Sequence, residues 1–218
     1  FSNTRSFFEK KKNEPKFKKA IAARVILKSK SELNISDENI SLMLGSKSHI
    51  VLYPINKKKE LNLVCIMRCK KFDPTNAKQL ITDLVLKQNP KLKNIFDNEI
   101  KSWPLYFTPK ILSSSNKKVF YIGDAFNGFL PTLAQGAGQS IESAYEIFNL
   151  LKENKLDMDT YFKLRSKRAK IVRKRSNFNF IVFHFSSSIM KKIRNIFLKF
   201  LVKRKTFIQG YLGKVYKN

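Results

Sequence analysis

The sequence predicts an α+β fold, in which an antiparallel sheet is followed by a glycine-rich loop and then by helices. Three observations support this division. Short β-prone runs dominate up to about Cys69, and a Gly-Asp pair followed by further glycines lies in the middle of the chain. After Gly138 the apolar residues recur at helical spacing. No repeat of fixed period interrupts this order.

Three β-prone runs form the predicted sheet: residues 17–27, 49–53 and 61–67. The polar residues between the second and third runs are typical of a hairpin, which implies antiparallel pairing. The segment between the first and second runs is rich in turn-forming residues, so we expect it to be a turn and linker. These residues are Asn34, Ser36, Asp37 and Gly45.

A helix is predicted over residues 77–87, because its apolar residues lie on one face and Asn89-Pro90 ends the pattern. A second short helix is predicted over residues 91–96. Residues 103–108 read as a strand or extended connection, and residues 113–118 as a turn. An apolar β-type run at residues 119–122 then leads into Gly123 and Asp124.

The remaining segments are predicted to be helical. The pattern places helices over residues 139–152 and 158–175, with breaks at Asn154 and Ser176-Asn177. A terminal pair of helices follows. In the first of these, apolar residues at positions 189, 193, 196, 197 and 200 fall on one face, with lysines mostly elsewhere.

Two interpretations of that amphipathic helix remain open. It docks on its own domain, which is what ordinary surface helices do, or it lies on an anionic membrane as a basic helix. The second would make the protein membrane-peripheral. No stretch approaches the roughly 20 consecutive apolar residues of a membrane-spanning helix.

The net charge of the chain is misleading as a guide to its partner. The formal charge of +28 over 218 residues suits a nucleic-acid or membrane surface. However, only nine of the 44 basic residues are arginine, the side chain that phosphate and base recognition favours. The lysines are spread from end to end beside many Asn, Ile and Phe, a residue set that AT-rich codons encode. We therefore expect no nucleic-acid partner.

The cysteines do not indicate a metal or redox site. Cys65 and Cys69 have three residues between them, which is neither a zinc pattern nor the CxxC redox motif. Structural thiols in a reducing cytoplasm are the better interpretation. The N-terminal residues lack the apolar stretch of a signal peptide, and we expect the chain to begin inside a longer protein.

The segment from residue 119 to 144 is the candidate functional site. It places small residues and backbone amides at a helix N-terminus, where the first amides have no partner inside the helix and the dipole is positive. An electron-rich group is expected there. Within it, GDAFNGFLPTLAQGAGQSIESA resembles the second flavin-binding signature of the FAD-dependent aromatic hydroxylases, which are class A flavoprotein monooxygenases. The spacing is closest to salicylate-hydroxylase-like members.

Weaker agreements flank this signature in the expected order. FSNTR at residues 1–5 resembles the residues after the family's Asp-Gly motif, and GSKSHIVLYPI at residues 45–55 resembles a substrate-domain strand. YFKLRSKRAKIVRKRSNFNFIVFH resembles the C-terminal helices. The family's GxGxxG turn is missing. The chain is thus expected to be a C-terminal portion that lacks its N-terminal dinucleotide-binding half and is inactive alone.

The resemblance implies four segments. They are a remnant after the Asp-Gly motif (1–16), the substrate-domain sheet and helices (17–110), the second flavin-binding segment (111–152) and the C-terminal helical region (153–218). By resemblance, FAD binds at five positions: Asp124 on the ribityl chain, Pro131 beside the ring, and Gly136, Ala137 and Gly138 at its pyrimidine edge.

The substrate side is expected to include His49, Tyr53 and Pro54, although a structural role for a strand histidine is the simpler alternative. No residue qualifies as catalytic. The resemblance implies that NAD(P)H reduces FAD and that a flavin C4a-hydroperoxide transfers oxygen from O₂ to an aromatic or similar ring. Phe126 and Asn127 replace the family's Ala-His, and Phe107 and Thr108 replace charged residues.

Two alternatives to ring hydroxylation remain. One is a related flavoenzyme of quinone biosynthesis, epoxidation or reduction, which would share the loop but differ in its substrate pocket. The other is a basic module that binds membrane or nucleic acid without catalysis.

Overall fold

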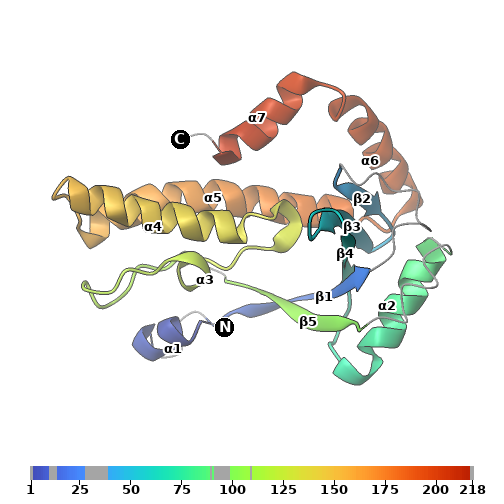
Figure 1. Ribbon diagram of the computed structural model, residues 1–218, viewed down its shortest axis with the longest axis horizontal. Coiled ribbons are helices and arrows are strands. Elements are labelled where there is room, and N and C mark those ends of the chain that lie inside the picture. Colours follow the sequence, from blue (N-terminus) through green and yellow to red (C-terminus); the bar gives the residue numbers. More distant parts are fainter. Residues whose placement is uncertain are drawn as a thin grey trace. The chain divides into compact units, whose positions relative to one another are not determined.

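The computed structural model describes residues 2–9, 14–27, 39–88, 90, 99–108 and 110–216. Internal contacts divide the chain into two units. The helices and strands of both units are labelled in Figure 1. Unit 1 consists of Phe1–Lys16, Tyr106–Phe180 and Asn195–Asn218, and unit 2 consists of Phe17–Leu105 and Ile181–Arg194.

A five-stranded sheet forms the body of unit 2. Its strands lie in the order β2-β3-β4-β1-β5, and the pairs β2–β3, β3–β4 and β4–β1 are antiparallel. The predicted antiparallel sheet is therefore confirmed. The strands are β1 (Lys16–Leu27), β2 (Ser41–Leu44), β3 (Ser48–Ile55), β4 (Glu60–Arg68) and β5 (Lys101–Phe107).

Strand β2 corrects the prediction of a linker between the first two runs. Its four residues pair with β3, with Leu44 opposite His49. The turn-forming composition around it concealed a short apolar edge strand, because the pairing of so short a strand is decided by its neighbour and not by its own propensity.

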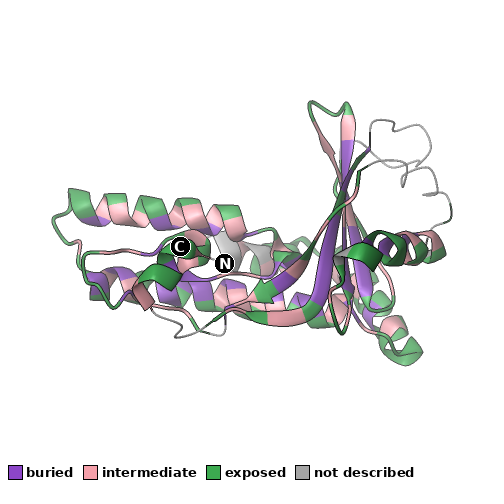
Figure 2. Ribbon diagram, turned by 90° about the horizontal axis from the view of Figure 1, so that it is seen from below, coloured by how far each residue is buried: buried purple, intermediate pink, exposed green. Residues whose placement is uncertain are grey.

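One face of the sheet carries the apolar core of unit 2. Alternate residues of β1, β3 and β4 point to it, as the two-residue repeat of a strand requires, and buried residues run along the strands in Figure 2. Helix α2 (Pro74–Gln88) contributes Ala77, Ile81 and Val85 at helical spacing. Asp73 begins this helix, since its carboxylate accepts the Thr75 amide at 2.9 Å.

Unit 1 is mainly helical. It contains α1 (Asn3–Glu9), α3 (Gly123–Phe126), the 3₁₀ turn η2 (Pro131–Leu133), α4 (Gly136–Lys152) and α7 (Lys205–Tyr216). Helices α5 (Met158–Phe183) and α6 (Ser188–Leu201) contribute residues to both units.

Helix α5 corrects the predicted break at residues 176–177. It continues for 26 residues because both polar side chains are satisfied without interrupting the backbone. Asn177 donates to the carbonyl of Arg173 at 3.0 Å, and Ser176 donates to the carbonyl of Leu130 at 2.5 Å.

Two further predictions need correction. Val119 to Ile122 form no strand, because no strand among the described residues pairs with them. Helix α4 begins at Gly136 and not at Gln139, so the glycines of the signature form its first turn. The short helix predicted over residues 91–96 lies outside the described residues.

The apolar face of α6 is exposed, which is contrary to the interpretation of a docked stripe. Ile189 is 70% and Phe200 64% exposed. The contact of α6 is instead polar: Arg194 is 4% exposed, and its guanidinium donates to the carbonyls of Phe183 and Leu44 at 3.3 Å each. Among the helices that the structure describes, none has the length and apolar character needed to cross a membrane.

Candidate functional site

One face of helix α5 holds in place the segments around the sequence that resembles a flavin-binding signature. The face carries Tyr161, Arg165, Arg168, Ser176 and Asn179, all buried and spaced by three, four or eight residues. This spacing keeps the side chains on one side of a helix with 3.6 residues per turn. Each of them forms a hydrogen bond with a residue between 121 and 143.

Tyr161 fixes the chain just before the Gly-Asp pair. Its hydroxyl donates to the carbonyl of Tyr121 at 2.7 Å, and its ring makes edge contacts with Phe120 and Phe126. Burial raises the pKa of the Tyr161 hydroxyl, so it stays a neutral donor. This contact positions Asp124 three residues later.

Ser176 and Asn179 fix the turn around Pro131. Ser176 donates to the carbonyl of Leu130, and Thr132 donates to the carbonyl of Ser176 at 2.7 Å. Asn179 donates to the carbonyl of Thr132 at 3.3 Å. The Pro131 backbone is thus anchored on both sides, while Pro131 itself is exposed.

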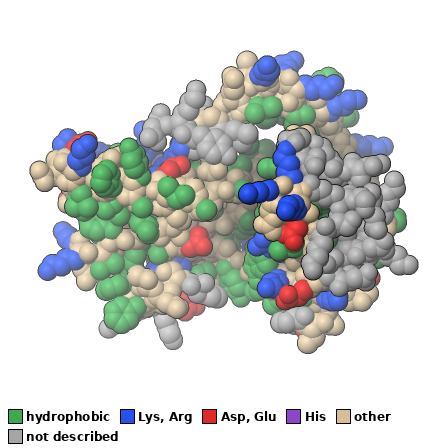
Figure 3. All heavy atoms as spheres, in the orientation of Figure 1, with side chains coloured by type: hydrophobic (Ala, Val, Ile, Leu, Met, Phe, Trp, Pro, Cys, Tyr) green, Lys and Arg blue, Asp and Glu red, His purple; other side chains and the backbone are tan. Residues whose placement is uncertain are grey.

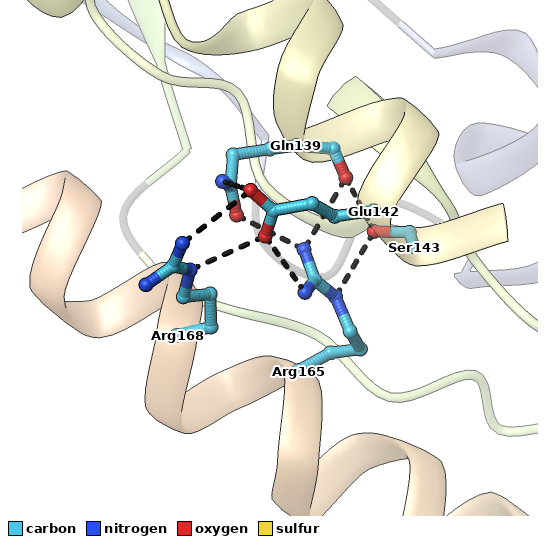
Figure 4. Close-up of polar contacts among 5 residues, drawn as sticks. All are labelled: Gln139, Glu142, Ser143, Arg165 and Arg168. Atoms are coloured by element: carbon cyan, nitrogen blue, oxygen red, sulfur yellow. Dashed lines mark hydrogen bonds and ion pairs between the residues drawn. The ribbon is translucent and has the colours of Figure 1, made fainter. Parts of the chain in front are cut away.

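Arg165 and Arg168 join α5 to the first turns of α4 (Figure 4). The Arg165 guanidinium donates to Glu142 Oε2 at 3.2 Å, to Ser143 Oγ at 3.2 Å, and to Gln139 through both its carbonyl and its Oε1. Arg168 donates through Nε to the same Glu142 oxygen at 3.2 Å. Gln139 completes the cluster by donating to Glu142 Oε1 at 2.9 Å. This cluster fixes the direction of α4.

The N-terminus of α4 presents free backbone amides. The first helical hydrogen bond runs from the Gln139 amide to the Gln135 carbonyl at 2.9 Å, and the side chain of Gln135, the N-cap residue, makes no capping hydrogen bond. The amides of Gly136, Ala137 and Gly138 therefore precede the hydrogen-bonded part of the helix, where amides point outward and the dipole is positive. Ala137 is exposed, and the two glycines are half-buried.

Gly136 is open on the side where a side chain would project. A Cβ built there meets no atom within 4 Å. Gly123 differs, because its φ is +55° and a Cβ would lie 2.5 Å from Ser140 Oγ. The protein's own packing thus explains glycine at 123 and leaves space beside Gly136.

A pocket of about 140 Å³ lies beside Asp124 within unit 1. Its lining includes Arg5, Tyr106, Thr108 and Gly128. Arg5 is 5% exposed, and its Nη1 has no hydrogen-bond partner among the residues that the structure describes. Desolvation lowers the Arg5 pKa, partly opposed by the charges of Tyr121 and Asp124. A buried guanidinium nitrogen therefore lies unpaired at a pocket that also holds a carboxylate.

The two departures from the family pattern contact each other. Thr108 donates to Asn127 Oδ1 at 3.3 Å and accepts the Gly128 amide at 2.9 Å. Both side chains are buried. The replacements at positions 108 and 127 thus form a local pair that holds the loop after α3.

The predicted substrate residues belong to unit 2, whereas the predicted flavin-binding residues belong to unit 1. His49 is 1% exposed, and its Nδ1 lies 3.2 Å from Nε2 of His184. Burial and the charge of His184 lower the His49 pKa to about 3. Tyr53 and Pro54 are half-buried on β3. A substrate role for these three residues stays a prediction.

The structure places Asp124, Pro131, Gly136, Ala137 and Gly138 in one unit, with the last three in the first turn of α4. The anchoring residues on α5 lie in the run that resembles the family's C-terminal helices, but the sequence did not indicate which segment each of them contacts. Among the described residues, no group of three or more His, Cys, Asp or Glu side chains could hold a metal ion.

Solved structures of flavoenzymes share this architecture. Klebsiella pneumoniae HpxO, complexed with FAD and uric acid, matches 97% of the chain at TM-score 0.76 and 11% identity. A salicylate hydroxylase in a substrate complex matches 94% at TM-score 0.64 and 18% identity. The chain covers 56% and 58% of these structures. Hispidin-3-hydroxylase of Neonothopanus nambi is 29% identical over 92 residues, which are 38% of this chain and 22% of that protein.

The fold is therefore that of the C-terminal portion of the class A FAD-dependent monooxygenases. The family model described as "Squalene epoxidase" matches residues 1–211. The chain belongs to this family. It spans less than three fifths of the length of the solved structures it matches.

Proposed function

We propose that this chain is the flavin-facing, C-terminal part of an NAD(P)H-using FAD monooxygenase. The observation that carries the proposal is the open N-terminus of α4, where three amides and the space beside Gly136 face outward next to an anchored Pro131 turn. Such a terminus favours groups that carry or develop negative charge.

The residues present fit an isoalloxazine ring and its ribityl chain. Gly136 has no neighbour that requires glycine, so a flat ring can approach the backbone there. Asp124 is exposed and lies at the pocket edge, where its carboxylate can accept a ribityl hydroxyl. The unpaired Arg5 nitrogen at the same pocket suits an anionic or carbonyl oxygen.

When bound, FAD would supply the redox chemistry: reduction by NAD(P)H, and then reaction with O₂ to a C4a-hydroperoxide that transfers one oxygen. The residues of this chain would bind and orient the ring. The amides of residues 136–138 would stabilise negative charge at its pyrimidine edge. The contacts of α5 with the signature would keep these amides in place.

Two substrate classes are supported by different relatives. Aromatic ring hydroxylation is supported by the hispidin and salicylate hydroxylases. Epoxidation of an apolar alkene is supported by the family model. In both cases one atom of O₂ enters the product and the other leaves as water.

The function is tested on the protein expressed from its complete reading frame. We expect a flavin absorbance spectrum and NAD(P)H oxidation that a ring or alkene substrate accelerates, with ¹⁸O from ¹⁸O₂ in the product. Asp124→Ala should raise the FAD dissociation constant about tenfold or more, whereas Asp159→Ala, an exposed carboxylate on α5, should leave it unchanged. A protein that retains no flavin after reconstitution with FAD would contradict the proposal.

We also propose a peripheral membrane contact through α6. Ile189, Ile193 and Phe197 are exposed on this helix, and Lys191, Lys192 and Lys199 accompany them. A basic amphipathic helix of this kind binds anionic lipid surfaces. Sedimentation with phosphatidylserine vesicles should depend on salt and be lost in Ile193→Asp. Equal sedimentation of wild type and variant would exclude this contact.

A further inference from the structure

Helix α7 docks on helix α5 through two aromatic side chains. Residues 205–206 and 208–210 are exposed, and Figure 3 shows lysine and arginine side chains on the surface of α6 and α7. Phe207 and Tyr211 are half-buried, and their rings stack with centroids 5.6 Å apart. Their spacing of four residues places them on one face of the helix. Within residues 205–211, this pair carries the docking of α7.

Tyr211 contacts α5 at two points. Its hydroxyl donates to Asn179 Oδ1 at 2.6 Å, and the Arg175 guanidinium lies over its ring, 4.9 Å from the centroid. Arg175 and Asn179 are four residues apart, so both lie on the same face of α5. Burial raises the pKa of the Tyr211 hydroxyl, which keeps it protonated and able to donate.

The hydrogen bond from Tyr211 fixes the orientation of the Asn179 amide. Asn179 is 9% exposed, and its Nδ2 donates to the Thr132 carbonyl at 3.3 Å. A carbonyl only accepts, so Nδ2 must face Thr132 and Oδ1 must face away from it. A buried acceptor without a partner is costly, and Tyr211 supplies the donor that Oδ1 then requires. With Tyr211 in place, one orientation of the amide satisfies both of its ends.

The Asn179 amide in turn holds the turn at Pro131. Pro131 begins η2, and the carbonyl that Asn179 binds belongs to the next residue. The turn closes when the Ala134 amide donates to the Pro131 carbonyl at 3.1 Å, with Ala134 at a φ of 51°. A residue other than glycine keeps this left-handed conformation only where its surroundings hold it. Loss of the Asn179 contact should therefore loosen residues 131–134.

We propose that Tyr211 is a positioning residue for the flavin site: it docks α7 on α5 and orients Asn179, which holds the Pro131 turn in the shape that binds FAD. The inference rests on the proposed function, because that proposal assigns Pro131 to the flavin. It makes α7 a part of the flavin site that acts through Asn179. Coupling between two sites is reciprocal, so bound FAD should also favour the docked α7.

The test is a double-mutant cycle in the protein from the complete reading frame. Tyr211→Phe removes only the hydroxyl and keeps the ring beside Arg175. It should raise the FAD dissociation constant about fivefold, the factor that one neutral hydrogen bond contributes, and alter the absorption spectrum of the bound flavin. Asn179→Ala should raise the constant at least as much. Because both substitutions break one chain of contacts, Tyr211→Phe should add less than about twofold in the Asn179→Ala protein.

Thr206→Val is the matched control, because it removes an exposed hydroxyl from the same helix. It should change neither the FAD dissociation constant nor the flavin spectrum. The melting temperature of each apoprotein shows that the variants are folded.

Hydrogen exchange of the apoprotein tests the contacts without FAD. The Ala134 amide should exchange at least about threefold faster in Tyr211→Phe than in wild type or in Thr206→Val. A full protein that binds no FAD would contradict the proposed function and the flavin role of Tyr211, whereas the exchange rates would still decide whether Tyr211 holds the turn.

Three results would overturn the inference while leaving the proposed function intact. The first is unchanged Ala134 exchange in Tyr211→Phe. The second is faster exchange with an unchanged FAD dissociation constant. The third is a double variant in which the effects of Tyr211→Phe and Asn179→Ala multiply, since independent effects would show that Tyr211 does not act through Asn179.

Discussion

Removal of the Arg165 guanidinium should destabilise the chain strongly. Arg165 is 5% exposed and donates four hydrogen bonds that join α5 to α4. In Arg165→Met these bonds are lost, and the Gln139 side-chain oxygen loses the only charged donor that contacts it in this cluster. Breaking a buried ion pair from one side costs about 3–5 kcal/mol.

The lower end of that range applies here. The Glu142 side chain is 31% exposed and keeps its contact with Arg168. We therefore expect Arg165→Met to lower the free energy of unfolding by about 3 kcal/mol. Arg165→Lys keeps the charge but has no planar fork of donors, so a loss of about 1–2 kcal/mol is expected.

Urea unfolding of the 218-residue chain, followed by circular dichroism, measures these differences. For a slope of about 2–3 kcal/mol per molar urea, Arg165→Met should shift the midpoint by about 1 M. Lys167→Met, at an exposed position on the same helix, should stay within about 0.5 kcal/mol of wild type. If Arg165→Met were as stable as wild type, the desolvation of the guanidinium would cancel its contacts, and the cluster would not be what fixes α4.

Three further predictions concern single groups. Because the His49 pKa is lowered to about 3, the unfolded chain binds a proton that the folded chain does not, so stability should fall as the pH falls from about 6.5 towards 3. Between pH 5.5 and 4.5 the free energy of unfolding of wild type should fall by about 1.4 kcal/mol more than that of His49→Gln. Identical pH profiles of the two proteins would contradict the burial of a neutral imidazole. Gly123→Ala should cost about 2–4 kcal/mol in urea unfolding, because it puts a Cβ at positive φ and 2.5 Å from Ser140 Oγ; Ser140→Ala in the same chain should recover part of the loss, and a Gly123→Ala chain of wild-type stability would refute the close contact. Burial raises the pKa of Cys65 to about 12, so iodoacetamide at pH 8 should modify the partly exposed Cys69 first and Cys65 only in urea; rapid native labelling at Cys65 would show that β4 opens.

The sequence predicted best where an element is stabilised by its own periodicity. Strands β1, β3 and β4 and helix α2 alternate or repeat apolar residues clearly enough to be placed within a few residues. The predictions for strand β2 and for residues 119–122 were wrong in opposite directions, for one reason. A strand exists only with a neighbour, and β2 has one in β3, whereas no described strand lies beside residues 119–122.

The helix boundaries show a second limit of sequence patterns. Ser176 and Asn177 resemble a break, but their side chains bond to carbonyls of Leu130 and Arg173 and leave the helix intact. Helix formation at Gly136 was similarly hidden, because glycine has a low helix propensity. At Ser176 a partner elsewhere in the structure, the Leu130 carbonyl, decides the outcome.

The residues of the candidate site were predictable from a sequence motif, but the contacts that hold them in place were not. Spacing and resemblance identified the loop residues, and the structure places all of them in unit 1. The contacts of Arg165 with Gln139 and of Thr108 with Asn127 join residues 26 and 19 positions apart. No local pattern encodes such pairs, since they depend on how separate segments of the chain pack together.

The most direct test of the account is the affinity of the complete protein for FAD after substitution of Gly136. Because a Cβ there meets no atom of the chain, Gly136→Leu should leave the melting temperature of the apoprotein within about 1 °C of wild type. If a flavin occupies that space, the FAD dissociation constant should rise at least about tenfold. Gly210→Leu, at an equally open glycine on α7, should change neither quantity. A folded Gly136→Leu protein that binds FAD as tightly as wild type would contradict a flavin at the N-terminus of α4.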